Sequence, residues 1–223
     1  HTDDAGQRVG AVASGSGRLP VLEGLSTMDS ASLKDALSRW AVAMDKAAPE
    51  LNELDSRLGD GDLGVTLQKC AHNVRAALPA APDSVQGILK CASQACADAS
   101  GSSFGTLFAS GLLAAAKWLD GRSLDRTALP ELLSHAVEKL SARGGASLGD
   151  KTMIDSLQAI TQALSKAQPQ DDLAAMARNA ASKAIEEFRD KPNRIGRARM
   201  FAEKSVGMDD PGMVAVLRMT ESL

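Results

Sequence analysis

Three aspartates in a short glycine-rich stretch are the residues of this chain best suited to chemistry. Residues 54–64 read LDSRLGDGDLG and contain Asp55, Asp60 and Asp62. Carboxylate oxygens are hard ligands that suit Mg²⁺, which is commonly held by carboxylates together with substrate phosphates. Three carboxylates at contact distance repel one another unless cations lie between them. The stretch therefore predicts a magnesium site that holds phosphate through the metal. The alternative is a solvated turn, because Asp and Gly are ordinary turn residues.

Two familiar motifs that this stretch resembles are excluded by their surroundings. Residues 59–64 match G-x-G-x-x-G, but a dinucleotide loop follows a strand, whereas Leu51, Leu54 and Leu58 have helical spacing. An EF-hand that begins at Asp60 needs an oxygen ligand at position 5 and a glutamate at position 12. Those positions hold a glycine and an alanine. A carboxylate cluster at the end of a helix remains.

Three later segments offer further candidate contacts to phosphate. Residues 99–105, ASGSSFG, place serines before an apolar helix, where they could bind phosphate or simply cap the helix. Residues 144–152, GGASLGDKT, mimic a P-loop, but Asp150 interrupts the motif and no strand precedes it. Residues 196–212 contain Arg197 among glycines, which could bridge phosphates or be a surface arginine. Only the first and third segments remain candidates.

The elements that must position these residues are helical. From about residue 27 onward, apolar residues recur at i, i+3, i+4 and i+7 in about eight stripes, and no segment has the pattern of a strand. One stripe ends near Leu58, which puts Asp55 on a last helical turn. Ser30 and Ser32 are possible caps of the first helix. Aromatic residues make up only 3% of the chain, which contains no tyrosine. The sequence therefore predicts an all-α bundle or barrel of about eight antiparallel helices.

Composition limits the classes of protein to which the chain can belong. With 223 residues, of which 44% are hydrophobic, residues 27–223 can form one domain. Residues 1–26 are rich in Gly and Ser and lack an initial Met, so we expect a linker cut from a longer chain or an expression remnant. The net charge of −3 argues against nucleic-acid binding.

The cysteines and hydropathy favour a reducing compartment. Cys70, Cys91 and Cys96 form no C-x-x-C pair, so we expect buried thiols. The chain has neither a run of about 18 apolar residues nor the layout of a signal peptide. We therefore expect no membrane span and a cytoplasmic location.

Taken in order, the motifs resemble the nucleotide-binding L domain (DhaL-type) of dihydroxyacetone kinases. The resemblance covers the chain from about residue 30 to its end. The matching pieces are LDSRLGDGDLG (54–64), ASG (99–101), FGT (104–106), GDKTMID (149–155), GRA (196–198) and SVGMDDPG (205–212).

This resemblance implies a barrel of eight antiparallel helices with ATP or ADP bound at one end through two Mg²⁺ ions. Asp55, Asp60 and Asp62 would be the metal ligands. The implied nucleotide-binding residues are Leu63, Gly64, Val65, Thr66, Ala99, Ser100, Gly144, Met153, Arg197, Asp210, Pro211 and Gly212. Family members often carry Gly-Gly before the A-S-G segment. Here Ala97 and Asp98 stand there, and Asp98 adds a negative charge near the phosphates.

The resemblance also implies a division of labour between two domains. In this family a histidine on a separate K domain holds the ketose covalently, whereas this chain offers only His1, His72 and His135, in the tail and in helical segments. We therefore expect no catalytic residue here, and we expect a nucleotide domain that donates the γ-phosphoryl group of ATP to a ketose on a K domain, in glycerol metabolism.

Three alternative functions stay open. The chain could be an ADP-carrying subunit that a phosphoprotein recharges, the nucleotide domain of a fatty-acid kinase, or a nucleotide-sensing regulatory module. The resemblance further implies a homo-oligomer through the parent kinase and a lipid-like occupant of the barrel.

Overall fold

The structure is a computed structural model that describes residues 27–99 and 101–223. The predicted linker 1–26 and the predicted phosphate contact Ser100 lie outside the described residues. The described residues form eight α-helices and two 3₁₀ segments, and they contain no strand. These are α1 (Ser30–Leu58), α2 (Leu63–Ala77), η1 (Leu78–Ala80), α3 (Val85–Ala99), α4 (Ser103–Trp118), α5 (Leu129–Gly144), α6 (Met153–Leu164), α7 (Leu173–Phe188), η2 (Arg197–Ser205) and α8 (Pro211–Thr220).

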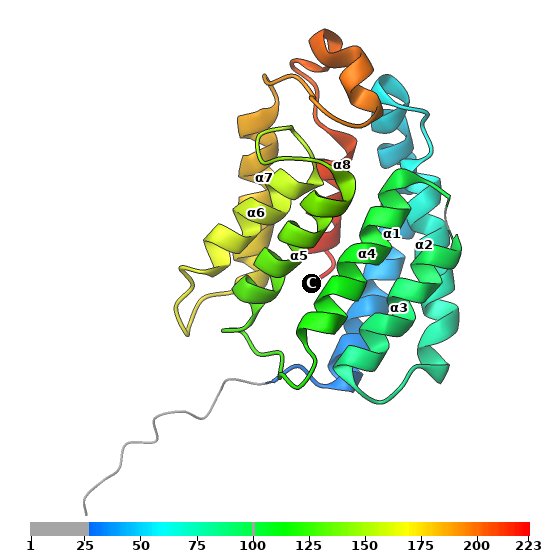
Figure 1. Cartoon of the computed structure of the whole chain (residues 1–223), viewed down its shortest axis with the longest axis vertical. Helices are drawn as coiled ribbons and strands as arrows, with labels where there is room; N and C mark the ends of the chain where they lie inside the picture. Colours follow the sequence, from blue (N-terminus) through cyan, green and yellow to red (C-terminus); the bar gives the residue numbers. More distant parts are fainter. Residues whose placement is uncertain (1–26, 100) are drawn as a thin grey trace, which may run out of the picture.

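The helices run up and down as an antiparallel ring (Figure 1). Each packs against its neighbours in sequence, and α8 completes the ring by packing against α1, α6 and α7. The prediction of an all-α barrel of about eight antiparallel helices is confirmed. Because every second connection returns to the same end, the segments 59–62, 101–102, 145–152 and 189–210 all lie at the upper end in Figure 1. The fold thus gathers the sequence motifs at one end of the barrel.

The segment η2, hereafter the cap, lies across this end (Figure 1). It comprises Arg197–Ser205 and follows the irregular segment 189–196 after α7. The cap is distinct from the barrel wall, because it crosses the helix ends instead of running along them.

Helix α1 contains Pro49 and continues past it to Leu58. Proline inside a helix removes one backbone hydrogen bond, and this proline is exposed. The N-cap of α1 is Asp29, whose carboxylate accepts a 2.7 Å bond from the Ser32 amide, so the expectation of Ser30 or Ser32 as the cap is corrected. The helix ends at Leu58, as predicted.

Small residues let the helices approach closely. A Cβ built at Gly64 in α2 would lie 2.0 Å from the backbone oxygen of Ala48 in α1, so only glycine fits there. Of the six aromatic residues only Trp40 is buried, and its ring stacks on that of half-buried Phe108 with centroids 5.3 Å apart. Across the closing edge, the Arg218 guanidinium makes two 2.7 Å bonds to Glu50, which join α8 to α1.

The three thiols are free, and the expectation that they are buried holds for two of them. Cys70 and Cys96 are buried and Cys91 is half-buried. None of the described helices combines the length and apolar character that crossing a membrane requires.

Candidate functional site

The three predicted metal ligands come together at the junction of α1 and α2. Asp55 lies on the last turn of α1, and Asp60 and Asp62 lie in the loop that follows. One carboxylate oxygen from each lies within 4.8 Å of the other two. Asp55 is half-buried, whereas the other two side chains are exposed. The structure therefore brings together the acidic trio that the spacing predicted; residues 59–62 are hereafter the acidic loop.

Hydrogen bonds from α1 to the start of α2 hold the acidic loop in place. Asp55 Oδ2 accepts the amide of Asp62 at 2.9 Å and that of Leu63 at 3.3 Å. Asn52, one turn earlier, accepts the Val65 amide at 3.1 Å through its side-chain oxygen. These bonds satisfy N–H groups that the first turn of a helix leaves without partners. Sequence reasoning missed Asn52, because a single asparagine inside a helix gives no motif.

The glycines of the acidic loop leave room beside the carboxylates. Gly61 has φ of +76°, a conformation that L side chains rarely adopt. A Cβ built at Gly59 would lie 2.5 Å from Asp55 Oδ1, so any larger residue there displaces the carboxylate. The pattern G-D-G-D is thus explained by the backbone turn at one glycine and by the space for a ligand atom at the other.

The trio fits a small divalent cation in donor type and in spacing. Ligand oxygens around Mg²⁺, at 2.0–2.1 Å from the ion, lie about 3 to 4 Å apart, so oxygens within 4.8 Å need only small side-chain movements to bind one ion. The exposure of Asp60 and Asp62 leaves room for the water or phosphate oxygens that complete an octahedron.

The predicted phosphate contact Arg197 reaches the acidic loop from the cap. Its guanidinium forms an ion pair with the carboxylate of Asp60, with both side chains about half exposed. The pair neutralises one of the three negative charges. An exposed pair of this kind is worth little in stability, because water screens it. The ion pair shows that a cation from the cap reaches one of the candidate metal ligands.

The start of α4 adjoins the start of α2. Ser102 caps α4 by accepting the Gly105 amide at 3.1 Å, and the Thr66 hydroxyl lies 3.1 Å from the Ser102 hydroxyl. The predicted residues Leu63, Gly64, Val65 and Thr66 form the first turn of α2. Two helix N-termini therefore lie side by side near the carboxylates, and N-terminal N–H groups favour anions.

The predicted contacts for the adenosine part divide into two groups. A Cβ built at Gly212 would lie 3.6 Å from the Met153 amide and 3.5 Å from the Phe104 ring, so the starts of α4, α6 and α8 meet there. Gly144 lies at the end of α5 and packs against Leu107 instead. Met153 and Pro211 are buried. The structure therefore joins Met153 to Gly212, whereas Gly144 lies beside Leu107 of α4.

Asp210 is buried and acts as a helix cap. Its carboxylate accepts the Met213 amide at 2.9 Å and the Asn193 side-chain amide at 2.8 Å. Burial raises the pKa of Asp210 to about 6, although these hydrogen bonds and the charge of Lys151 oppose the shift. The acidic side chain of the predicted D-P-G turn thus points into the protein.

A groove of about 550 Å³ lies on the outside of α1, α2 and α3. Among the predicted site residues that the structure describes, only Ala99 borders it, together with Asp98 and His72. The Asp98 carboxylate accepts a 2.7 Å hydrogen bond from the side-chain amide of Gln94, one turn earlier in α3, so the carboxylate points back along that helix. His72 is exposed and lies ten residues after Asp62 on α2, roughly 15 Å along the helix, and so is remote from the acidic loop.

Residues 57–223 match the family model described as the DAK2 domain. The chain belongs to the DAK2 domain family. This DAK2 domain is 35% identical over 192 residues to the "L-erythrulose 1-kinase" of Mycolicibacterium smegmatis, with 82% of this chain and 33% of the relative covered. It is 31% identical over 193 residues to the "PEP-dependent dihydroxyacetone kinase, ADP-binding subunit DhaL" of Escherichia coli, with 84% and 92% covered.

A solved structure has the same fold. The dihydroxyacetone kinase from C. freundii, in complex with AMP-PNP and Mg²⁺, matches with a TM-score of 0.70 and 24% identity, over 97% of this chain and 37% of that chain. The DAK2 domain thus spans about a third of the erythrulose kinase that it matches and most of the ADP-binding subunit. The resemblance to the DhaL-type domain, first noted from the motifs, is confirmed.

Proposed function

We propose that this DAK2 domain is the nucleotide-binding part of a ketose kinase, which donates the γ-phosphoryl group of ATP to a ketose held on a K-type domain. The observation that carries the proposal is the convergence of Asp55, Asp60 and Asp62 at the N-terminus of α2, which adjoins that of α4. The relatives named as erythrulose kinases and as an ADP-binding subunit support the class of reaction.

The residues have distinct parts in this scheme. Mg²⁺, two ions in the full proposal, would neutralise the phosphates and be held by the three aspartates. The amides of Leu63 and Val65 are already bonded to Asp55 and Asn52, so the starts of α2 and α4 would act on the phosphates through the partial positive charge of a helix N-terminus. Arg197 would move from Asp60 to a phosphate oxygen, because a cation held by Asp60 would balance the charge of that carboxylate in its place. The chain itself orients the donor and supplies no nucleophile, consistent with phosphoryl transfer as a matter of positioning and charge neutralisation.

We assign the adenosine part of the nucleotide to the side of the site where the starts of α4, α6 and α8 meet. Met153 and the Asp210–Gly212 turn meet Phe104 there and offer apolar surface beside the start of α6. Ala99 and Gly144 stay predicted contacts at the edges. Ser100 is also proposed as a phosphate contact, although it lies outside the described residues.

The partner and the phosphoryl source follow from the same proposal. A K domain would supply the ketose site and the contacts of a homo-oligomer. It would be either fused to this domain through residues 1–26 as a linker or a separate subunit. The relatives include both long kinases and an ADP-binding subunit named as PEP-dependent. Adding a K domain with ATP, or with a phosphoprotein donor, distinguishes the two sources by which mixture phosphorylates dihydroxyacetone.

The remaining expectations have separate tests. A cytoplasmic role in glycerol metabolism is tested by growth of a deletion strain on glycerol. A lipid in the barrel is tested by mass spectrometry of an organic extract of the purified chain.

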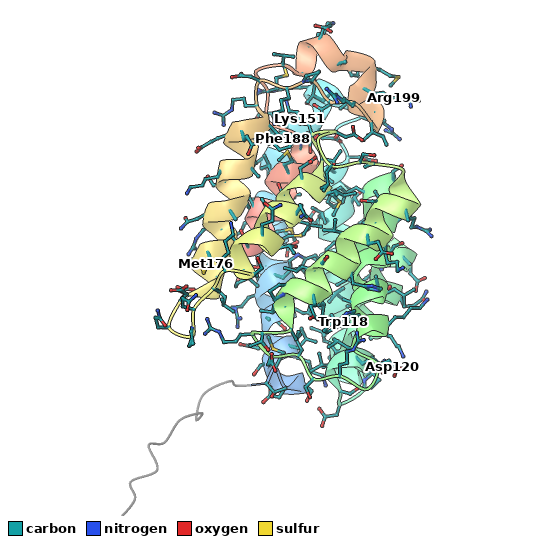
Figure 2. All side chains as sticks on the ribbon, turned by 60° about the vertical axis from the view of Figure 1, so that its left-hand side comes forward. Trp118, Asp120, Lys151, Met176, Phe188 and Arg199 are labelled. Carbon is teal, nitrogen blue, oxygen red and sulfur yellow. The ribbon has the colours of Figure 1, made fainter. Side chains whose placement is uncertain are left out.

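Calorimetric titration with ATP tests the proposed function directly. The chain should bind ATP in Mg²⁺ and lose that binding in EDTA, and Asp60→Asn should abolish the magnesium-dependent part. Asp120→Asn is the matched control, because Asp120 lies at the opposite end of the barrel (Figure 2). Magnesium-independent binding, or equal effects of the two substitutions, would contradict the proposal.

A further inference from the structure

The lysine of the P-loop-like segment is buried beneath the cap, not exposed to phosphate. Lys151 is 1% exposed, and its Nζ donates to the carbonyl oxygens of Arg189 at 2.9 Å, Lys191 at 2.8 Å and Ser205 at 2.8 Å. An ammonium group has three N–H donors, and here all three are used inside the protein. Lys151 therefore has no donor left for a phosphate.

The backbone at this position would suit glycine better than lysine. Lys151 has φ of +63°, and among the described residues it alone combines a side chain with a left-handed conformation. A residue with a side chain is strained in this conformation, so we expect lysine here only if its side chain is needed. The geometry thus indicates that the ammonium group is the reason for a lysine here.

The three carbonyl groups come from the two ends of the segment that carries the cap. Arg189 and Lys191 directly follow α7, and Ser205 is the last residue of the cap. Without Lys151, three carbonyl groups would converge with no cation between them. Their partial negative charges would favour separation, and the end of the cap would lift from α7.

A second set of bonds ties this point to the remaining helices. The Asn193 side chain donates to the backbone oxygen of Lys151 and to the Asp210 carboxylate, both at 2.8 Å, and the Asn193 amide donates to the Ser205 hydroxyl at 2.8 Å. Asn193 and Ser205 are both buried. The network connects the start of α6, the end of the cap and the start of α8.

The opposite end of the cap reaches the acidic loop. Arg197 begins the segment that Ser205 ends, and it pairs with Asp60. Figure 2 shows Lys151 at the same end of the barrel as Arg199 of the cap. A fixed Ser205 limits how far Arg197 can move from the acidic loop.

We propose that Lys151 is a positioning residue for the nucleotide site, whose buried ammonium group holds the cap so that Arg197 lies over the acidic loop. The statement about nucleotide rests on the function proposed above, whereas the hold on the cap does not. Burial lowers the pKa of Lys151, and the carboxylates of Asp210 and Asp209 oppose that shift. The ammonium form is retained because three carbonyl dipoles surround it.

The test replaces the side chain while it keeps the backbone. Lys151→Gly suits the left-handed conformation and leaves a cavity shaped for butylammonium, which reproduces the lysine side chain. Hydrogen–deuterium exchange by mass spectrometry is measured on the 223-residue chain, alone, with butylammonium and with 1-butanol at constant pH. Lys139→Ala, at an exposed lysine of α5, controls for effects of losing a lysine and of the added amine.

We expect amides of residues 194–207 to exchange roughly tenfold faster or more in Lys151→Gly, with α2 and α3 unchanged. Butylammonium should restore slow exchange, whereas butanol should not. The Kd for Mg·ATP should rise and recover in parallel. Unchanged exchange in the cap, equal acceleration throughout the barrel, or equal rescue by butanol would overturn the proposal. A wild-type chain that binds no Mg·ATP would overturn the function proposed above, and the exchange data would still decide whether Lys151 holds the cap.

Discussion

Two polar clusters at the same end of the barrel differ in how completely their charges are balanced. The acidic trio places three carboxylates within 4.8 Å of one another, and among the described cations only Arg197 forms an ion pair with it. The cluster around Lys151 satisfies every donor of its ammonium group and is buried. Uncompensated charge marks where a ligand is expected, whereas a buried ammonium group with every donor satisfied indicates a structural role.

Removing one carboxylate from the trio should have the largest effect on ligand binding. For Asp62→Asn we expect the affinity for Mg·ATP to fall roughly 100-fold or more, because a metal ligand is lost. The melting temperature without ligand should stay the same or rise, because like-charge repulsion falls. Calorimetry and thermal melts measure the two effects. A variant with a lower melting temperature and unchanged affinity for Mg·ATP would show that the acidic trio has a structural role instead of binding a ligand.

The buried cluster should show its effect in the pH dependence of stability. Since burial raises the pKa of Asp210 to about 6, the folded state binds more protons than the unfolded state between about pH 4 and 6. This contribution is fully present below about pH 4 and is lost as the pH rises through 6, by on the order of 3 kcal/mol. Urea unfolding at pH 4.5 and 7 measures the change. Asp210→Asn should remove it, and an unaltered slope would refute the assignment.

A methyl group beside Asp55 should separate binding from folding. Gly59→Ala places a Cβ 2.5 Å from Asp55 Oδ1, so the carboxylate must move. The φ of −151° at Gly59 spares alanine a left-handed conformation, although the ψ of −143° lies beyond the usual β region and adds some strain. We expect about tenfold weaker binding of Mn²⁺, followed by electron paramagnetic resonance, and an unfolding free energy within about 1 kcal/mol of wild type. Unchanged Mn²⁺ affinity would show that Asp55 is not a ligand.

The smallest expected effect has opposite signs for two ligands. Arg197→Gln removes the cation that pairs with Asp60, so Mg²⁺ alone should bind a few-fold more tightly. Mg·ATP should bind a few-fold more weakly, because the phosphates lose an arginine. Arg199→Gln, at an exposed arginine of the cap, is the control. Changes of the same sign for both ligands would argue that Arg197 does not exchange partners.

The same contrast explains what the sequence could predict. The acidic trio was predictable because its members lie within eight positions across a helix end, so local periodicity alone brings them together. The network of Lys151 was not, because its partners are main-chain carbonyls 38 to 54 positions away, and every residue has a carbonyl. The motif that mimics a P-loop was correctly rejected, but the role of its lysine appeared only in the fold.

The helices were predictable for a similar reason, and the exceptions are local. Apolar stripes identified the eight helices and the end of α1 at Leu58. Pro49 did not break α1, because an exposed proline costs one hydrogen bond while the packing of Gly64 on Ala48 holds the helices together. The cap, with its 3₁₀ turns and weak hydrophobic pattern, gave no signal of its own.

The most direct test of the metal site is a crystal structure of the chain with Mn²⁺ and a non-hydrolysable ATP analogue, measured at the manganese absorption edge. We predict an anomalous peak about 2.1 to 2.3 Å from carboxylate oxygens of Asp55, Asp60 and Asp62, with Arg197 on a phosphate. Anomalous density elsewhere would contradict the account. So would three carboxylates that face apart with no anomalous peak between them.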